Sequence, residues 1–278
     1  MIEFTQGTVV YGARCKRYPN QPCYAIVITA RCDIANSKTN KIFYLVGVPV
    51  NQWIVSNNGY YEIVKGKTNN TKKEIEKSLL KYGLDLDSII TFSDSETQTV
   101  FHDANVDEKD GFKIKEMLSK YRNFTSGELT TEQKRMILQE IKPDVQNTVQ
   151  NINSGKNSHY IVVPSNVIES INGEDVENLV VDLQEIDYWT LDTVEKLKKR
   201  EIDVRNTRLT KCDKSDLDTC FFVKESPGYA EIIGKVTSPW IEFVMQRFTN
   251  LFSRIGVDSL SETEVKELVK MSLEENGG

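Results

Sequence analysis

Three short apolar runs, rich in β-branched and aromatic residues, limit the fold more than any other feature of this chain. They occupy residues 7–11, 24–33 and 42–50. Polar loops with Pro, Asn, Lys and Ser separate them, a pattern that is typical of β-strands joined by turns. The sequence therefore predicts a small, strongly bent β-structure at the N-terminus.

A β-hairpin is expected directly after these runs. The pair Asn58-Gly59 separates apolar residues at 53–55 and 60–64. An Asn-Gly pair between two apolar segments favours a hairpin turn. On this interpretation the β-rich, barrel-like domain extends over residues 1–105.

Periodicity predicts most of the other elements, because strands repeat every 2 residues and helices every 3.6. The expected elements are a helix over 71–81, strands over 88–93 and 97–102, helices over 110–122 and 130–152, strands over 160–164 and 179–183, a helix over 190–201, and strands over 219–224 and 229–236.

Capping and helix-breaking residues refine these boundaries. Pro143 should end or kink the helix over 130–152. The pair Ser238-Pro239 favours a helix start, since serine is a good N-cap and proline fits the first helical position. This predicts a helix over 239–255, and a capping box near residue 261 predicts a final helix.

The expected fold class is α+β. A small SH3-like barrel section comes first, over residues 1–105. A helical connector follows over 106–157, and an α+β domain with a C-terminal helical pair occupies 158–278.

Composition excludes some classes of protein. Hydrophobic residues make up 39% of the 278 residues and charged residues 27%, as in globular proteins. Apolar runs fall well short of the ~18 residues that span a bilayer, and the first residues do not look like a signal peptide. We therefore expect a cytoplasmic protein without membrane contact. A net charge of −6 disfavours nucleic acid as a partner, although a local basic patch is compatible with it.

Residues 1–60 resemble the PemK/MazF toxin family, which is built on a small SH3-like barrel. The family's Gly-x-Val-Val, Pro-apolar-Val-Ile and Val-x-Pro-apolar strands correspond here to residues 7–10, 22–28 and 48–50. The resemblance implies the same barrel at the N-terminus of this chain.

The resemblance does not extend to the residues that cleave RNA. The family uses an arginine just before the second strand and a threonine near the end of the third. This sequence has Gln21 at the first place and Pro49-Val50 at the second. Both departures argue against ribonuclease chemistry and leave a barrel used for binding or structure.

The cysteines form two pairs with equal spacing. Seven residues separate Cys15 from Cys23, and seven separate Cys212 from Cys220. If the two loops meet, four thiolates could hold a structural zinc ion, although zinc sites usually have closer cysteines. The alternative is that the cysteines are small buried hydrophobes or inert thiols.

A polar cluster lies at the end of the second apolar run. Arg31 and Asp33 flank Cys32, and a thiol beside an arginine can become a nucleophile if a base is near. Only His102 and His159 could serve as a histidine base, and both are distant in sequence. We expect Arg31 and Asp33 to act in binding or in fixing a turn.

The helix over 239–255 has polar and aromatic residues outside its main apolar stripe. Trp240, Arg247 and Arg254 belong to this second face, and aromatic and arginine side chains are enriched at protein interfaces. A protein partner is the functional interpretation, and a core helix buried on two sides is the alternative.

These features favour a non-enzymatic interaction or regulatory subunit of a prokaryotic complex. The general style of the chain is similar to that of accessory proteins of bacterial defence operons. The resemblance to MazF leaves an endoribonuclease, or another enzyme acting on nucleic acid, as the alternative. A basic groove near Arg14, Lys16, Arg17 and Arg31 would support it.

Overall fold

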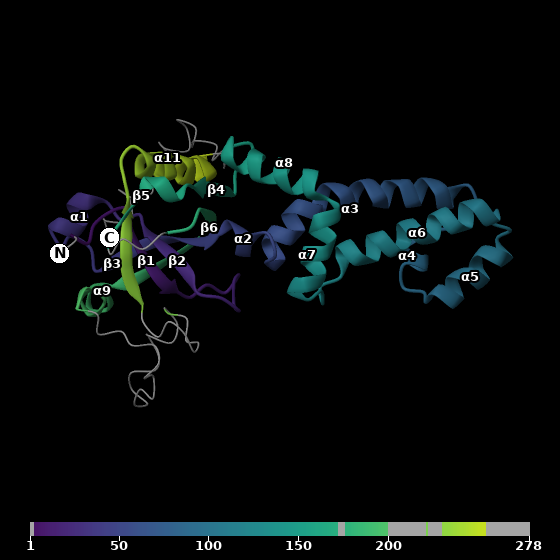
Figure 1. Ribbon diagram of the computed structural model, residues 1–278, viewed down its shortest axis with the longest axis horizontal. Coiled ribbons are helices and arrows are strands. Elements are labelled where there is room, and N and C mark those ends of the chain that lie inside the picture. The colour runs from purple at the N-terminus through teal and green to yellow at the C-terminus, as the bar shows by residue number, and fades with distance from the viewer. Residues whose placement is uncertain (1–2, 172–175, 200–220, 222–229, 254–278) are drawn as a thin grey trace, which may run out of the picture.

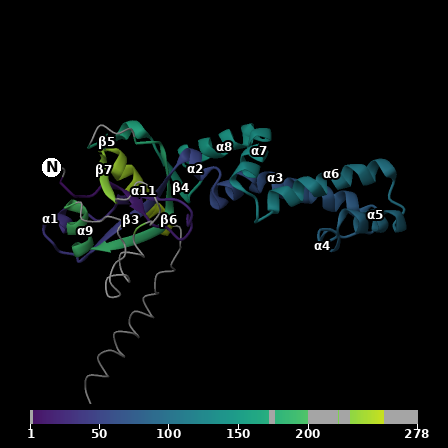
Figure 2. The ribbon, with the colours of Figure 1, turned by 60° about the horizontal axis from the view of Figure 1, so that its bottom comes forward.

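The computed structural model describes residues 3–171, 176–199, 221 and 230–253. It is a mixed α and β structure with two regions, a curled antiparallel sheet at one end and a long helical arm at the other (Figure 1). Figure 2 shows the same separation after rotation. No helix in the described ranges is long and apolar enough to cross a membrane.

The sheet contains seven strands in the order β4-β6-β3-β2-β1-β7-β5, and every neighbouring pair is antiparallel. Strands from both ends of the chain therefore meet in one sheet, and the first three strands form its centre rather than a clear separate barrel. The strands are β1 (Thr8–Ala13), β2 (Cys23–Val27), β3 (Lys41–Pro49), β4 (Tyr160–Val163), β5 (Ile168–Ser170), β6 (Leu179–Thr190) and β7 (Glu231–Val236).

Two hydrophobic cores lie on opposite faces of this sheet. Side chains alternate along β3, so Tyr44 and Val46 enter one core whereas Leu45 enters the other. The first core includes Val194 of α9 (Leu191–Lys198), and the second includes Val244 of α11 (Trp240–Ser253).

The helical arm is one continuous stretch of chain between β3 and β4. Its long helices α3 and α6 lie side by side, and a third core fills the space between them and the short helices at the tip (Figure 1). The helices are α2 (Val50–Trp53), α3 (Asn57–Leu80), α4 (Leu86–Ile89), α5 (Asp94–Asp103), α6 (Glu108–Thr125), α7 (Thr131–Glu140) and α8 (Lys142–Asn153).

The hairpin expected around Asn58-Gly59 is wrong, because both residues lie in the first turn of α3. The hydroxyl of Ser56 caps this helix by accepting a hydrogen bond from the Gly59 N–H, 3.0 Å away. A Cβ at position 59 would overlap the carbonyl oxygen of Trp53. The glycine is therefore needed for close contact between α2 and α3 and not for a turn.

The strands expected over 88–93 and 97–102 are also wrong, since α4 and α5 occupy this region. Ser93 and Glu96 form a reciprocal capping box that starts α5. This capping signal was present in the sequence and outweighs the short apolar runs.

Most other expected elements are confirmed. The three N-terminal runs form β1, β2 and β3, although residues 31–35 form the short helix α1 (Arg31–Ala35) instead of a strand end. The helical stretch breaks near Pro143 as expected: α7 ends at Glu140, and Pro143 lies in the first turn of α8. Of the strand expected over 219–224, only Phe221 is described, and the final helix near residue 261 lies outside the described residues.

Candidate functional site

Arg31, predicted as a binding residue, lies against the start of α11. Its Nη2 is 3.5 Å from Glu242 Oε1 and 3.4 Å from Ser238 Oγ. The Ser238 hydroxyl also donates to Glu242 Oε1 at 2.7 Å, which lowers the pKa of this exposed carboxyl. This cluster joins α1 to α11 across 211 positions of sequence.

Two apolar hollows lie beside this cluster, and we call them together the α11 surface. The first, of about 640 Å³, is lined by Trp240, Phe243 and Gln246, with Pro239 and Glu242. The second, of about 350 Å³, brings Asp33 together with apolar residues from four different elements and loops. Its main apolar residues are Ile28, Phe43, Ile186 and Phe248.

The α11 surface exposes large apolar side chains to solvent. The exposed fractions are 38% for Phe243, 38% for Phe43 and 44% for Ile186. The Trp240 and Phe243 rings meet edge to face at 5.7 Å, so their positions are fixed by each other. Arg31, Asp33 and Trp240, selected from separate parts of the sequence, thus converge on one surface.

Arg247 has a different place from the one expected. Its guanidinium donates to the carbonyl oxygens of Gly155 at 3.0 Å and Asn157 at 2.6 Å, both in the loop after α8. Gly155 has a φ of +78°, and a Cβ there would lie 2.7 Å from the guanidinium. Arg247 therefore ties α11 to the base of the arm. Arg254 lies outside the described residues.

The two described members of the expected zinc site are buried beside one network of polar groups. The Cys15 thiol donates to Glu185 Oε2 at 3.5 Å, and burial raises its pKa to about 12. Burial also raises the pKa of Cys23. Cys212 and Cys220 lie outside the described residues, and the residues that are described contain no group of three or more side chains placed to hold a metal. The zinc site stays a prediction.

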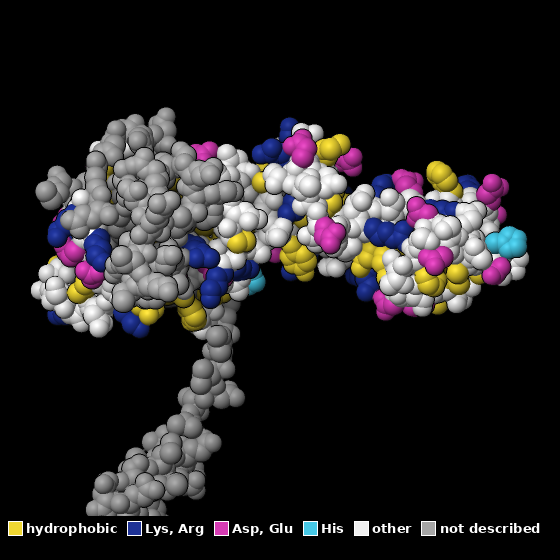
Figure 3. Space-filling model, turned by 90° about the horizontal axis from the view of Figure 1, so that it is seen from below, with side chains coloured by type: hydrophobic (Ala, Val, Ile, Leu, Met, Phe, Trp, Pro, Cys, Tyr) yellow, Lys and Arg dark blue, Asp and Glu magenta, His cyan; other side chains and the backbone are white. Residues whose placement is uncertain are grey.

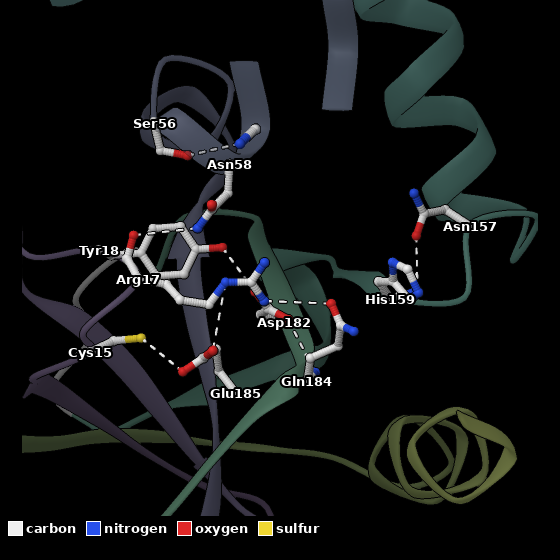
Figure 4. A network of polar contacts seen from close by, with 11 residues as sticks. Cys15, Arg17, Tyr18, Ser56, Asn58, Asn157, His159, Asp182, Gln184 and Glu185 are labelled. Atoms are coloured by element: carbon white, nitrogen blue, oxygen red, sulfur yellow. Dashed lines mark hydrogen bonds and ion pairs between the residues drawn. The ribbon is translucent and has the colours of Figure 1, made fainter. Parts of the chain in front are cut away.

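A buried ion pair, which sequence reasoning missed, fixes the loop between β1 and β2 to strand β6 (Figure 4). The carboxylate of Asp182, 1% exposed, accepts from Arg17 Nη1 at 3.0 Å and from the Tyr18 hydroxyl at 3.2 Å. Its other oxygen accepts from the Gln184 N–H at 3.1 Å. The only sequence signal was a single acid inside the apolar run 179–183.

This network of hydrogen bonds and ion pairs serves to hold the β1–β2 loop in place. Burial raises the pKa of Asp182, while the Arg17 guanidinium beside it acts in the opposite sense. Arg17 Nε is 3.6 Å from Glu185 Oε1, so two carboxylates share one guanidinium. The network holds the β1–β2 loop in a single conformation next to the base of the arm.

The arm also exposes apolar side chains, among them Leu80 and Phe112. On the face seen in Figure 3, its basic and acidic side chains are intermixed, with separate hydrophobic patches between them. Comparison of the whole chain with protein-family models, with curated proteins and with solved structures finds no match.

Proposed function

We propose that this chain is a non-enzymatic interaction or regulatory subunit of a prokaryotic complex, and that its α11 surface docks a partner protein. The observation that carries the proposal is the pair of apolar hollows beside the Arg31–Glu242 ion pair. Apolar surface that stays exposed next to fixed polar groups is typical of protein interfaces.

The partner that fits this surface presents apolar side chains on one face of a short segment. Two such side chains would enter the hollows lined by Phe243 and by Phe43, and polar groups of the segment would face Arg31. Complete burial of a large apolar side chain is worth ~1.5–3 kcal/mol, so covering the exposed part of Phe243 contributes about 1 kcal/mol. Several such contacts are needed for a stable complex.

The surface is also prepared for binding, which lowers the entropic cost of association. Arg247 fixes the middle of α11 to the loop at Gly155, and the Arg31 cluster fixes its start. Docking would therefore require side-chain adjustment rather than movement of the helix.

A nucleic-acid-acting enzyme, in particular a MazF-like endoribonuclease on an SH3-like barrel, is the second candidate. The resemblance of residues 1–60 and the basic residues Arg14, Lys16 and Arg17 support it. Two ion pairs to Asp182 and Glu185 already engage Arg17, which weakens that support. RNA cleavage by the purified protein that is abolished in Arg31→Ala would establish this candidate instead.

The context of a cytoplasmic protein in phage defence or in a toxin–antitoxin system belongs to the same proposal. Its support is the sequence resemblance alone. Metal analysis of the purified complex addresses the four-cysteine zinc site, and stoichiometric zinc that is lost in Cys212→Ser would support it.

Native mass spectrometry of the protein purified from its host with its neighbours tests the docking proposal. The test variant is Phe243→Glu, which places a charge in the first hollow. The matched control is Phe112→Glu on the arm, where the side chain is 73% exposed. We expect a stoichiometric partner with the natural protein and with the control. With Phe243→Glu, the amount of bound partner should fall at least tenfold. Equal retention in both variants would refute the docking site.

A further inference from the structure

A polar cavity of about 700 Å³ lies where the helical arm joins the sheet. One wall is the β1–β2 loop from Arg17 to Gln21, the second is the junction of α2 and α3, and the third is the loop before α7 with its first turn. None of these lining residues belongs to the α11 surface. The cavity has the volume of a site for a small ligand.

The charges that line this cavity are mostly positive. Arg17, Lys134 and Arg135 contribute three cations, whereas Glu128 is the single acidic residue among the lining residues. Arg17 pairs with both Asp182 and Glu185, and Arg135 lies 3.6 Å from Glu132. Among these three cations, Lys134 is the one for which the described residues supply no carboxylate partner.

Lys134 is the most unusual of these residues. It is only 6% exposed, yet within the described part of the chain its ammonium pairs with no carboxylate. Its contacts are a hydrogen bond to Asn57 Oδ1 and the ring of Tyr60, whose centre is 5.8 Å away. Burial lowers its pKa, as expected for a cation that lacks a counter-charge. Buried charges are normally paired, so the ammonium lacks an anion.

Two helices begin at the same cavity. Ser56 and Asn57 at the start of α3 line it, as do Thr130 and Thr131 at the start of α7. The first turn of a helix leaves N–H groups without partners inside the helix, and its dipole favours a negative charge there. The Nε2 of Gln21 in the first wall is also buried without a hydrogen-bond partner.

We propose that this cavity binds the phosphate group of a small ligand, no larger than a nucleotide, with Lys134 as the central cation. A phosphate brings the negative charge that Lys134 lacks and enough acceptor oxygens for the ammonium, the Arg135 guanidinium and helix N–H groups. The site does not depend on the proposed docking function, because the two surfaces share no residue.

Isothermal titration calorimetry at low ionic strength tests this site, with inorganic phosphate, adenosine 5′-monophosphate and adenosine as probes and chloride at equal ionic strength as reference. We expect the two phosphate-bearing probes to bind and adenosine to fail. Lys134→Met should weaken phosphate binding roughly ten- to hundredfold, the effect of one charge-assisted hydrogen bond. Lys113→Met, at an exposed position on α6, is the matched control and should bind as the natural protein does.

A second variant, Lys134→Gln, can still donate to Asn57 and thus separates charge from folding. It should also lose phosphate binding, and both variants should melt no lower than the natural protein, because each removes an uncompensated buried charge. The proposal is overturned if neither phosphate probe binds more tightly than chloride, if adenosine binds as well as its monophosphate, or if Lys134→Gln retains full affinity.

Discussion

The sheet and the helical arm differ in how the chain builds them. Each of the central strands pairs with two neighbours, and pairs such as β3 with β6 and β1 with β7 join segments at least 130 positions apart. The arm uses one unbroken stretch, and its distal core joins helices that follow one another in sequence. Local contacts form and open more independently than contacts between distant segments. The sheet should therefore unfold as a unit, whereas the arm should open by itself.

The largest effect is expected from Trp189→Ala in the sheet. The indole is fully buried, and its ring contacts Tyr44 at 4.2 Å and Phe221 at 5.5 Å between ring centres. The truncation should destabilise the protein by about 3–5 kcal/mol. Urea unfolding followed by circular dichroism should show a lower midpoint for the transition in which the sheet unfolds. A loss confined to part of the helical signal would contradict a cooperative sheet.

A smaller and more local effect is expected from Leu118→Ala in the arm. Leu118 is 1% exposed in the distal core, and the truncation should cost about 2–5 kcal/mol of local stability. Hydrogen exchange should accelerate in α3, α5 and α6, while the strands keep their protection. Equal acceleration in β3 would show that the arm and the sheet unfold together.

The ion pair at the base of the arm gives a prediction with a defined pH dependence. Because burial raises the pKa of Asp182, the folded state binds its proton more tightly than the unfolded state. The contribution of Asp182 to stability is then greatest below the unfolded pKa of ~3.9 and falls as pH rises through the folded pKa. Asp182→Asn lacks this titration and keeps an acceptor for Tyr18.

Relative to the natural protein, Asp182→Asn should therefore gain stability between pH 4 and pH 7. Urea unfolding at both pH values measures the difference, with Asp187→Asn at an exposed position of β6 as control. If Asp182→Asn instead loses stability relative to the natural protein toward pH 7, the Arg17 ion pair lowers the pKa of Asp182 by more than burial raises it.

The smallest effect concerns the thiols and leaves stability unchanged. Cys32 is exposed on α1, whereas Cys15 is buried with a pKa of about 12. A maleimide reagent at pH 8 should label Cys32 rapidly and Cys15 only after denaturation, because the thiolate is the reactive form. Peptide mapping identifies the labelled sites. Rapid labelling of Cys15 would show that the Glu185 contact opens easily.

The sequence predicts the sheet strands better than the arm for a physical reason. The N-terminal runs are rich in β-branched and aromatic residues and are flanked by turn residues, whereas the apolar run 88–93 fits either a strand or a buried helix. The Asn58-Gly59 pair gave a wrong hairpin prediction, because a glycine is required at position 59 by the close approach of the Trp53 carbonyl. No local sequence pattern reveals that contact. Tertiary contact outweighed the turn preference of these two residues.

The candidate site was predictable only in part. Arg31, Asp33 and Trp240 were recognisable by residue type, but their meeting depends on sheet topology. Likewise, Arg17 and Asp182 are 165 positions apart, and no spacing rule connects them. The burial of Lys134 is visible only in the packed arm, since its sequence neighbours are polar.

Hydrogen-exchange mass spectrometry of the isolated protein and of its purified complex would show whether a partner docks on the α11 surface, because it follows the sheet region and the arm in one experiment. We expect at least severalfold slower exchange in the complex over α1 and the start of α11, with the tip of the arm at α4 and α5 unchanged. Protection confined to the arm, with α11 exchanging at its free rate, would contradict docking on the α11 surface.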